Sequence, residues 1–213
     1  MTPTLIDISP PLTAQTPVFP GDTAFRSKRT WVLAGDCPVN VSRIELTTHA
    51  GAHADAPLHY DNAGAPIDAV DLEPYIGPCA VIHVIKDAAL LRAADVSAAL
   101  EEHAGALPSR VLIRTYNRQP SDWDPRYAAI SAEAIEFLAG KDVRLIGVDT
   151  PSLDPASSKI MDAHKAVYRN DMRILEGLLL DHVAPGQYEL IAPPLKLAGL
   201  DAAPVRAVLR TLP

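Results

Sequence analysis

The chain has 213 residues, 48% of them hydrophobic and 5% aromatic, which fits one sizeable domain with a buried core better than two. Its formal net charge of -7 comes from acidic residues scattered along the chain, without the lysine and arginine stripe that binds phosphates, which disfavours nucleic acid and anionic membranes as partners. Residues 1–22 have no basic start, and no apolar stretch approaches the ~20 residues that span a bilayer, so we expect a soluble, cytoplasmic protein.

Short segments rich in Val, Ile and Leu, bounded by Gly, Pro or Asp, predict β-strands. In chain order these predicted strands are 41–48, 80–85, 110–116, 143–149, 174–180, 188–192 and 205–212. Helical patterns are fewer, with Ser131 as the expected N-cap of the second, and they cover 94–104, 131–141 and 162–171. Because strands predominate, we predict an α/β (α+β) fold with a sheet-rich core and a few helices, as a single domain over residues 1–213.

The first predicted strand leads into a segment with four metal-ligating side chains, His49, His53, Asp55 and His59. A helix does not suit this segment, since Asp55 would lie about 240° around the axis from His49. Gly51 and Pro57 also oppose a helix. In an extended or looping chain the four side chains occupy odd positions and can converge on one side, so we expect an extended ligand ribbon.

Imidazole nitrogens and carboxylate oxygens are the ligands of zinc, and also of manganese or iron. A lone histidine is usually structural, but three histidines and an aspartate buried together without a metal would carry a large desolvation cost. Gly51 would let the backbone approach the metal without a side-chain clash. The segment therefore predicts a divalent-metal site that activates water.

Two further ligand candidates follow. His164 lies on the predicted helix 162–171, and Glu176 is a carboxylate inside the apolar segment 174–180. Each alone is compatible with an ordinary role, as a solvated helix histidine or an edge-strand glutamate. Together they would complete a second metal position with Asp55 as the bridge. We expect structural roles for the remaining histidines, which are His83, His103 and His182. Asp and Pro are ordinary turn residues, so we expect the same of the turn-rich loop 149–155.

The run H-A-G-A-H-A-D-A-P-L-H resembles the HxGTHxDxPxH signature of the metal-dependent cyclase family. Other motifs resemble the bacterial kynurenine formamidase (arylformamidase) branch, among them D-I-S-P-P-L, G-V-D-T-P-S-L-D-P, I-L-E-G and L-D-A-A-P-V-R-A-V-L-R. The resemblance implies a swivelling β/β/α-type domain, a homodimer and two divalent metal ions per subunit, usually zinc. It also implies hydrolysis of N-formyl-L-kynurenine to L-kynurenine and formate in tryptophan degradation, by a metal-bound hydroxide.

Carried over by motif, the resemblance implies a first metal held by His49, His53 and Asp55. The second metal would be held by Asp55, His164 and Glu176. His59 would be the proton donor and acceptor.

Two positions depart from the family pattern. Ala52 replaces the usual threonine, and Phe19 replaces a tryptophan of the branch, so that Phe19 is the expected contact for the substrate ring but lacks an indole N–H. Two other functions stay open. One is a related cyclic amide or lactone hydrolase, or a dehydratase, acting on another small acid; the other is a binding protein in which the metal only holds the fold.

Overall fold

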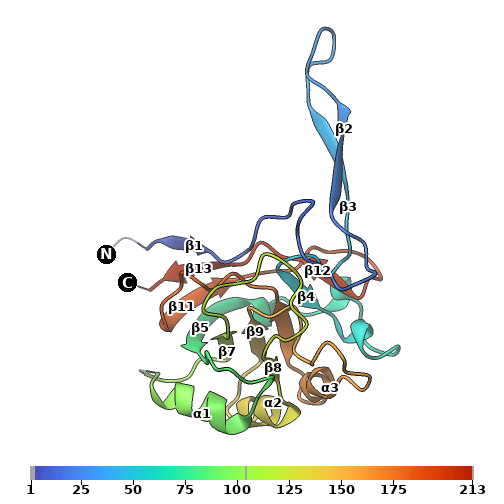
Figure 1. The fold of residues 1–213 in the computed structure, drawn as a ribbon. Helices are drawn as coiled ribbons and strands as arrows, with labels where there is room; N and C mark the ends of the chain where they lie inside the picture. The colour runs from blue at the N-terminus through green and yellow to red at the C-terminus, as the bar shows by residue number, and fades with distance from the viewer. Residues whose placement is uncertain (1–2, 104, 213) are drawn as a thin grey trace.

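The computed structural model describes residues 3–103 and 105–212, and its core is a nine-stranded sheet that curls around one side of the molecule (Figure 1). The order of strands is β1 (Leu5–Asp7), β13 (Val208–Thr211), β11 (Gly186–Ile191), β5 (Ile76–His83), β7 (Arg110–Arg114), β9 (Leu145–Val148), β10 (Arg173–Glu176), β4 (His53–Asp55) and β12 (Ala202–Pro204). Neighbouring strands from β5 to β10 are parallel, and the outer pairs are antiparallel.

Helices cover one face of the parallel strands, as Figure 1 shows, and they are α1 (Ala93–Glu101), α2 (Ala132–Ala139) and α3 (Asp162–Arg169). Strand β9 and the centre of β7, between its terminal arginines, are apolar and buried, as expected of parallel strands that are covered on both faces. One apolar cluster fills the space between these strands and the helices, and a second fills the curl on the opposite face. The short strands β6 (Leu90–Leu91) and β8 (Ala129–Ile130) pair with each other near the helices.

The predicted class, a sheet-rich α/β fold with a few helices, is confirmed. Each predicted helix is present, and the hydroxyl of Ser131 accepts a hydrogen bond from the N–H of Ala134, as expected of an N-cap. Each predicted strand is present in part. The segment 174–180 was predicted too long, because the strand ends at Glu176 where Gly177 takes a φ of +65°.

The expected extended ribbon at 47–59 is only partly correct. Residues His53–Asp55 form β4, but the chain turns at 48–52, and Pro57–His59 form a single 3-10 turn. Gly51, with a φ of +61°, permits the first turn, and Pro57 starts the second. The four candidate side chains therefore converge through two turns around a short strand.

A two-stranded arm formed by β2 (Arg26–Trp31) and β3 (Val41–Glu45) extends away from the body (Figure 1). Every residue of both strands is exposed. Within the described residues the two cysteines are free, and no helix has the length and apolar character to cross a membrane.

Candidate metal centre

The centre is organised around β4, which lies between β10 and β12. The antiparallel register of β4 and β10 places His53 opposite Glu176. The register of β4 and β12 places Asp55 opposite Ala202, so that Asp201 precedes β12 beside the centre. Residues opposite each other in antiparallel strands have Cβ atoms about 4.5–5.5 Å apart. Sheet pairing therefore brings together residues that are far apart in the sequence.

Two glycines shape the approach to β4. The carbonyl oxygen of Gly51 accepts a hydrogen bond from Nδ1 of His53 at 2.9 Å. Gly177 packs against this same peptide so closely that a Cβ at Gly177 would overlap the Gly51 carbonyl oxygen. Because Nδ1 of His53 donates to a carbonyl, the lone pair of the neutral ring is on Nε2, the nitrogen that faces the centre.

Asp55 lies in the middle of the cluster, and its two oxygens face different histidines. Oδ1 is 3.1 Å from Nδ1 of His49 and 3.5 Å from Nε2 of His53. Oδ2 is 3.3 Å from Nε2 of His164. The carboxylate thus has the arrangement of a bridge between two groups of ligands.

Glu176 joins the same two buried histidines from the neighbouring strand. Its Oε2 is 3.3 Å from Nε2 of His53, and its Oε1 is 3.4 Å from Nε2 of His164. The backbone N–H of Leu153 donates to Oε1 at 2.8 Å. The carboxylate therefore has a fixed position at the end of β10.

Several buried atoms in this cluster have no hydrogen-bond partner among the residues described: Nε2 of His53, Nε2 of His164 and both oxygens of Asp55. An unsatisfied buried polar atom costs about 1–3 kcal/mol. Two sets of three residues could each hold a metal ion, because the ligand atoms within each set all lie within 4.8 Å of one another. The sets are His53, Asp55 and Glu176, and His49, Asp55 and His59. The residues fit a divalent metal, because coordination would satisfy these lone pairs together.

Opposite charges in the cluster shift the pKa values of its members away from their usual ranges. Burial lowers the pKa of His49, but the negative charges of Asp55 and Asp201 beside its ring outweigh burial and raise the pKa to about 9. Burial likewise opposes protonation of His164, yet its carboxylate neighbours raise its pKa well above the usual value. Burial raises the pKa of Asp55, but the histidines hold it well below its usual range. A divalent cation bound here would replace these shared protons.

Asp154 is a site residue that the sequence prediction missed, since loop 149–155 was treated as an ordinary turn. Its Oδ2 accepts a hydrogen bond from Nδ1 of His164 at 2.6 Å. Backbone N–H groups of Ala163 and His164 donate to the same carboxylate at 3.1 Å each. Asp154 thereby fixes the ring of His164 with Nε2 toward Asp55. The signal in the sequence that could have identified Asp154 is its position ten residues before His164, a candidate ligand on the next helix.

Asp201 is the second missed residue. Its Oδ2 lies 2.9 Å from Nε2 of His49 and 3.5 Å from Nδ1 of His59, and Thr48 donates to its other oxygen at 3.2 Å. The rings of His49 and His59 are 4.3 Å apart. The geometry of His59 thus suits either a ligand or a group that carries a proton at the edge of the centre.

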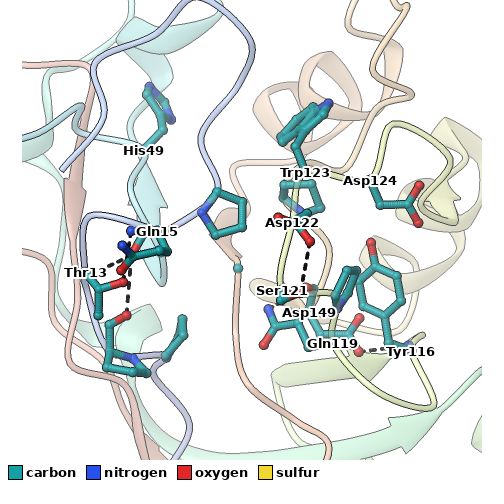
Figure 2. A pocket seen from close by; sticks show the side chains of 18 of the residues that line it. Thr13, Gln15, His49, Tyr116, Gln119, Ser121, Asp122, Trp123, Asp124 and Asp149 are labelled. Carbon is teal, nitrogen blue, oxygen red and sulfur yellow. Dashed lines mark hydrogen bonds between the residues drawn. The ribbon is translucent and has the colours of Figure 1, made fainter.

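Two cavities of about 280 Å³ and 580 Å³ open onto the centre, and His49 lines both. Figure 2 shows the smaller cavity, with His49 on one wall and Trp123 and Asp149 on the other. The larger cavity reaches His59 and Glu176. Phe19 lines the larger cavity and is 54% exposed, with its ring centroid 5.4 Å from that of Trp123, and its contact with a substrate ring stays a prediction.

Histidines predicted to be structural lie elsewhere and bond to other groups. His83 lies 2.9 Å from the carbonyl oxygen of Val183, and His182 lies 3.0 Å from that of Asp7. His103 lies 3.4 Å from the side chain of Gln187.

A family model described as "Putative cyclase" matches residues 6–155, which is more than half of the chain. The chain belongs to the cyclase family. The match includes the segment 47–59, so the family assigned from the sequence motif is confirmed. The resemblance to the kynurenine formamidase branch stays a prediction.

Solved structures similar to this cyclase chain share its whole fold. A potential metal-dependent hydrolase with cyclase activity is 27% identical, with a TM-score of 0.83 and 100% of both chains covered. A predicted metal-dependent hydrolase from Bacillus stearothermophilus is 28% identical, with a TM-score of 0.82 and the same coverage. An isatin hydrolase bound to the product analogue thioisatinate is 24% identical, with a TM-score of 0.83 over 99% of this chain and 93% of that one, and this likeness concerns the fold.

Proposed function

We propose that this cyclase-family chain is a metal-dependent amide hydrolase that converts N-formyl-L-kynurenine to L-kynurenine and formate in tryptophan degradation. The observation that carries the proposal is the convergence of unpaired buried atoms of His53, Asp55 and His164 beside a cavity with aromatic walls. Similarity to solved metal-dependent hydrolases supports the metal and the reaction class. The motifs of the formamidase branch support the substrate.

Two divalent ions, for which we propose zinc, would be held by the residues that converge around Asp55. The first set is His49, His53 and Asp55, and the second is Asp55, His164 and Glu176. Bound metal supplies a Lewis acid for the carbonyl oxygen and lowers the pKa of bound water to near 7.

The chain's own residues would bind the substrate and move its proton. Phe19 and Trp123 line the larger cavity and would hold the aniline ring beside the centre. His59 would donate a proton from Nε2 to the departing aniline nitrogen, because its Nδ1 faces Asp201. An anilide nitrogen leaves poorly unless it is protonated, so this transfer should control turnover more than binding.

A second candidate reaction is hydrolysis of a cyclic amide, which is compatible with the fold shared with an isatin hydrolase. Isatin also carries an amide nitrogen on an aromatic ring, so the same centre would serve. A panel of N-formylkynurenine, isatin, other cyclic amides and lactones separates the two. We expect formate release from N-formylkynurenine to be fastest, to stop after chelation and to return with zinc. Faster turnover of a cyclic amide would assign the second reaction.

The role of His59 has its own test. We expect His59→Ala to keep its metal content and lose most of its kcat. Near-normal kcat would contradict the role of His59 as acid.

We also propose that the protein is a homodimer in which each β2–β3 arm packs on a second copy. The arm exposes large apolar side chains, with Trp31 60%, Leu33 58% and Ile44 60% exposed. An isolated two-stranded ribbon is marginally stable in water, so a partner surface would stabilise it. The arm carries cations at Arg26, Lys28, Arg29 and Arg43, whereas the chain as a whole has a net charge of -7. A second copy offers the complementary acidic body.

A further inference from the structure

The two cavities at the metal centre differ in charge. The smaller one is lined by the carboxylates Asp122, Asp124 and Asp149, and no lysine or arginine is among its described lining residues. The larger one contains Lys159, the one lysine or arginine among the described residues that line either cavity. Lys159 is therefore the lysine at this cavity that a negatively charged substrate group can reach.

Lys159 lies on a loop with a defined turn just before α3. The N–H of Ser158 donates to the carbonyl of Pro155 at 2.8 Å, and the hydroxyl of Ser158 accepts a hydrogen bond from the N–H of Met161 at 3.1 Å. Met161, which takes a left-handed φ of +53°, starts the helix that carries His164. The turn thus orders the backbone at Lys159, whose exposed side chain lines the cavity a few residues before the helix that carries His164.

Asp22 lines the same cavity from the N-terminal segment. Its N–H donates to the carbonyl of Phe19 at 2.9 Å, which closes a turn, and its carboxylate accepts from the N–H of Thr23 at 2.6 Å. The cavity wall therefore combines an aromatic side chain, a carboxylate and an ammonium group. A substrate with a ring and a zwitterionic tail matches this combination in charge.

We propose that Lys159 determines specificity by binding the carboxylate of the substrate's amino-acid tail, and that Asp22 binds its ammonium group. The assignment rests on the proposed function, because it takes the formyl group to lie at the metal centre. The volume of about 580 Å³ is in the range of small-molecule sites and accommodates a ring and a tail together. Asp22 lines the same cavity wall, so a substrate carboxylate bound there needs a cation that offsets this like charge.

The test compares two substrates that share the reacting group. N-formyl-L-kynurenine carries the amino-acid tail, and 2′-formamidoacetophenone has the same ring, formamide and ketone without it. We expect Lys159→Met to raise KM for the tailed substrate about tenfold with little change in kcat, and to leave KM for the tailless one unchanged. Asp22→Asn should show the same pattern, and Lys159→Arg should restore much of the loss.

The control variant is Lys196→Met, an exposed lysine away from both cavities, which should leave both substrates unaffected. Metal content is measured for each variant. An equal effect on both substrates, or no effect on the tailed one, would overturn the role of Lys159. If the wild-type protein releases formate from neither substrate, the proposed function fails, and this assignment fails with it.

Discussion

Asp154 and His164 are joined by a 2.6 Å hydrogen bond between Oδ2 and Nδ1, which aims Nε2 of the histidine at Asp55. Such a carboxylate orients a histidine ligand and increases its basicity, and its loss costs about 10–100-fold in metal affinity or activity. We expect Asp154→Asn to weaken metal binding by that factor. Titration against a competing chelator measures it. Asp162→Asn, at the exposed start of α3, is the control, and wild-type affinity in Asp154→Asn would contradict the orienting role.

Asp201 is expected to act on turnover through His59. Replacement by Asn keeps the shape but removes the charge that faces His49 and His59. We expect kcat for formate release to fall about 10–100-fold. Metal affinity should fall less than turnover, because Asp201 faces the ligand His49 but the buried carboxylates Asp55 and Glu176 remain. Steady-state kinetics with metal analysis checks both, and Asp61→Asn is a nearby control. Unchanged kcat would remove Asp201 from the site.

Gly177 should be intolerant of a side chain. Gly177→Ala would strain a positive φ, at about 1–3 kcal/mol, and would also push against the Gly51 carbonyl that holds His53. We expect both a loss of unfolding free energy and a loss of metal. Gly199→Ala is the matched control, since its φ is +74° but nothing lies within 4 Å of the added Cβ. Equal effects of the two substitutions in urea denaturation would show that the contact with Gly51 does not matter.

The exposed apolar side chains of the β2–β3 arm lead us to expect a dimer in solution. Light scattering should give twice the 22.8 kDa mass of one chain. The double variant Trp31→Ser, Ile44→Ser should give a single chain, because it removes two of the largest exposed apolar groups of the arm. Leu195→Ser, which is equally exposed elsewhere, should leave the mass unchanged. A single-chain mass for the wild-type protein would contradict the dimer.

Asp95 makes the start of α1 sensitive to acid. Hydrogen bonds from Lys86 and from the N–H of Arg92 lower its pKa, so the folded state binds this proton less readily than the unfolded one. Its stabilising effect is then present above the usual value of 3.8 and is lost as the pH falls through the lowered value. We expect Asp95→Asn to cost about 0.5–1 kcal/mol at pH 7 and less at pH 3. Urea denaturation of chelated protein measures this, with Asp87→Asn as control; a difference that grows in acid would have the wrong sign.

The family, the fold class and the candidate ligands could all be predicted from the amino-acid sequence. Three histidines and an aspartate in segment 47–59 are local in the chain, so their spacing alone predicted a metal site. Apolar runs such as 110–116 and 143–149 likewise predicted buried strands, because burial on both faces requires continuous hydrophobic residues. The end of β10 was less predictable, since Gly177 takes a positive φ of +65° beside the Gly51 peptide, a packing that no local pattern reveals.

The distant groups that complete the centre could not be predicted from the sequence, because folding brings them together. Asp154 and Asp201 occur in loops where aspartate is an ordinary turn residue, so composition does not distinguish them. Their roles arise because α3 places His164 over Asp154, and because pairing of β12 with β4 places Asp201 beside His49. The charge difference between the two cavities is equally a product of folding. This charge difference arises because loops that are far apart in the sequence lie side by side in the fold, which residue spacing does not predict.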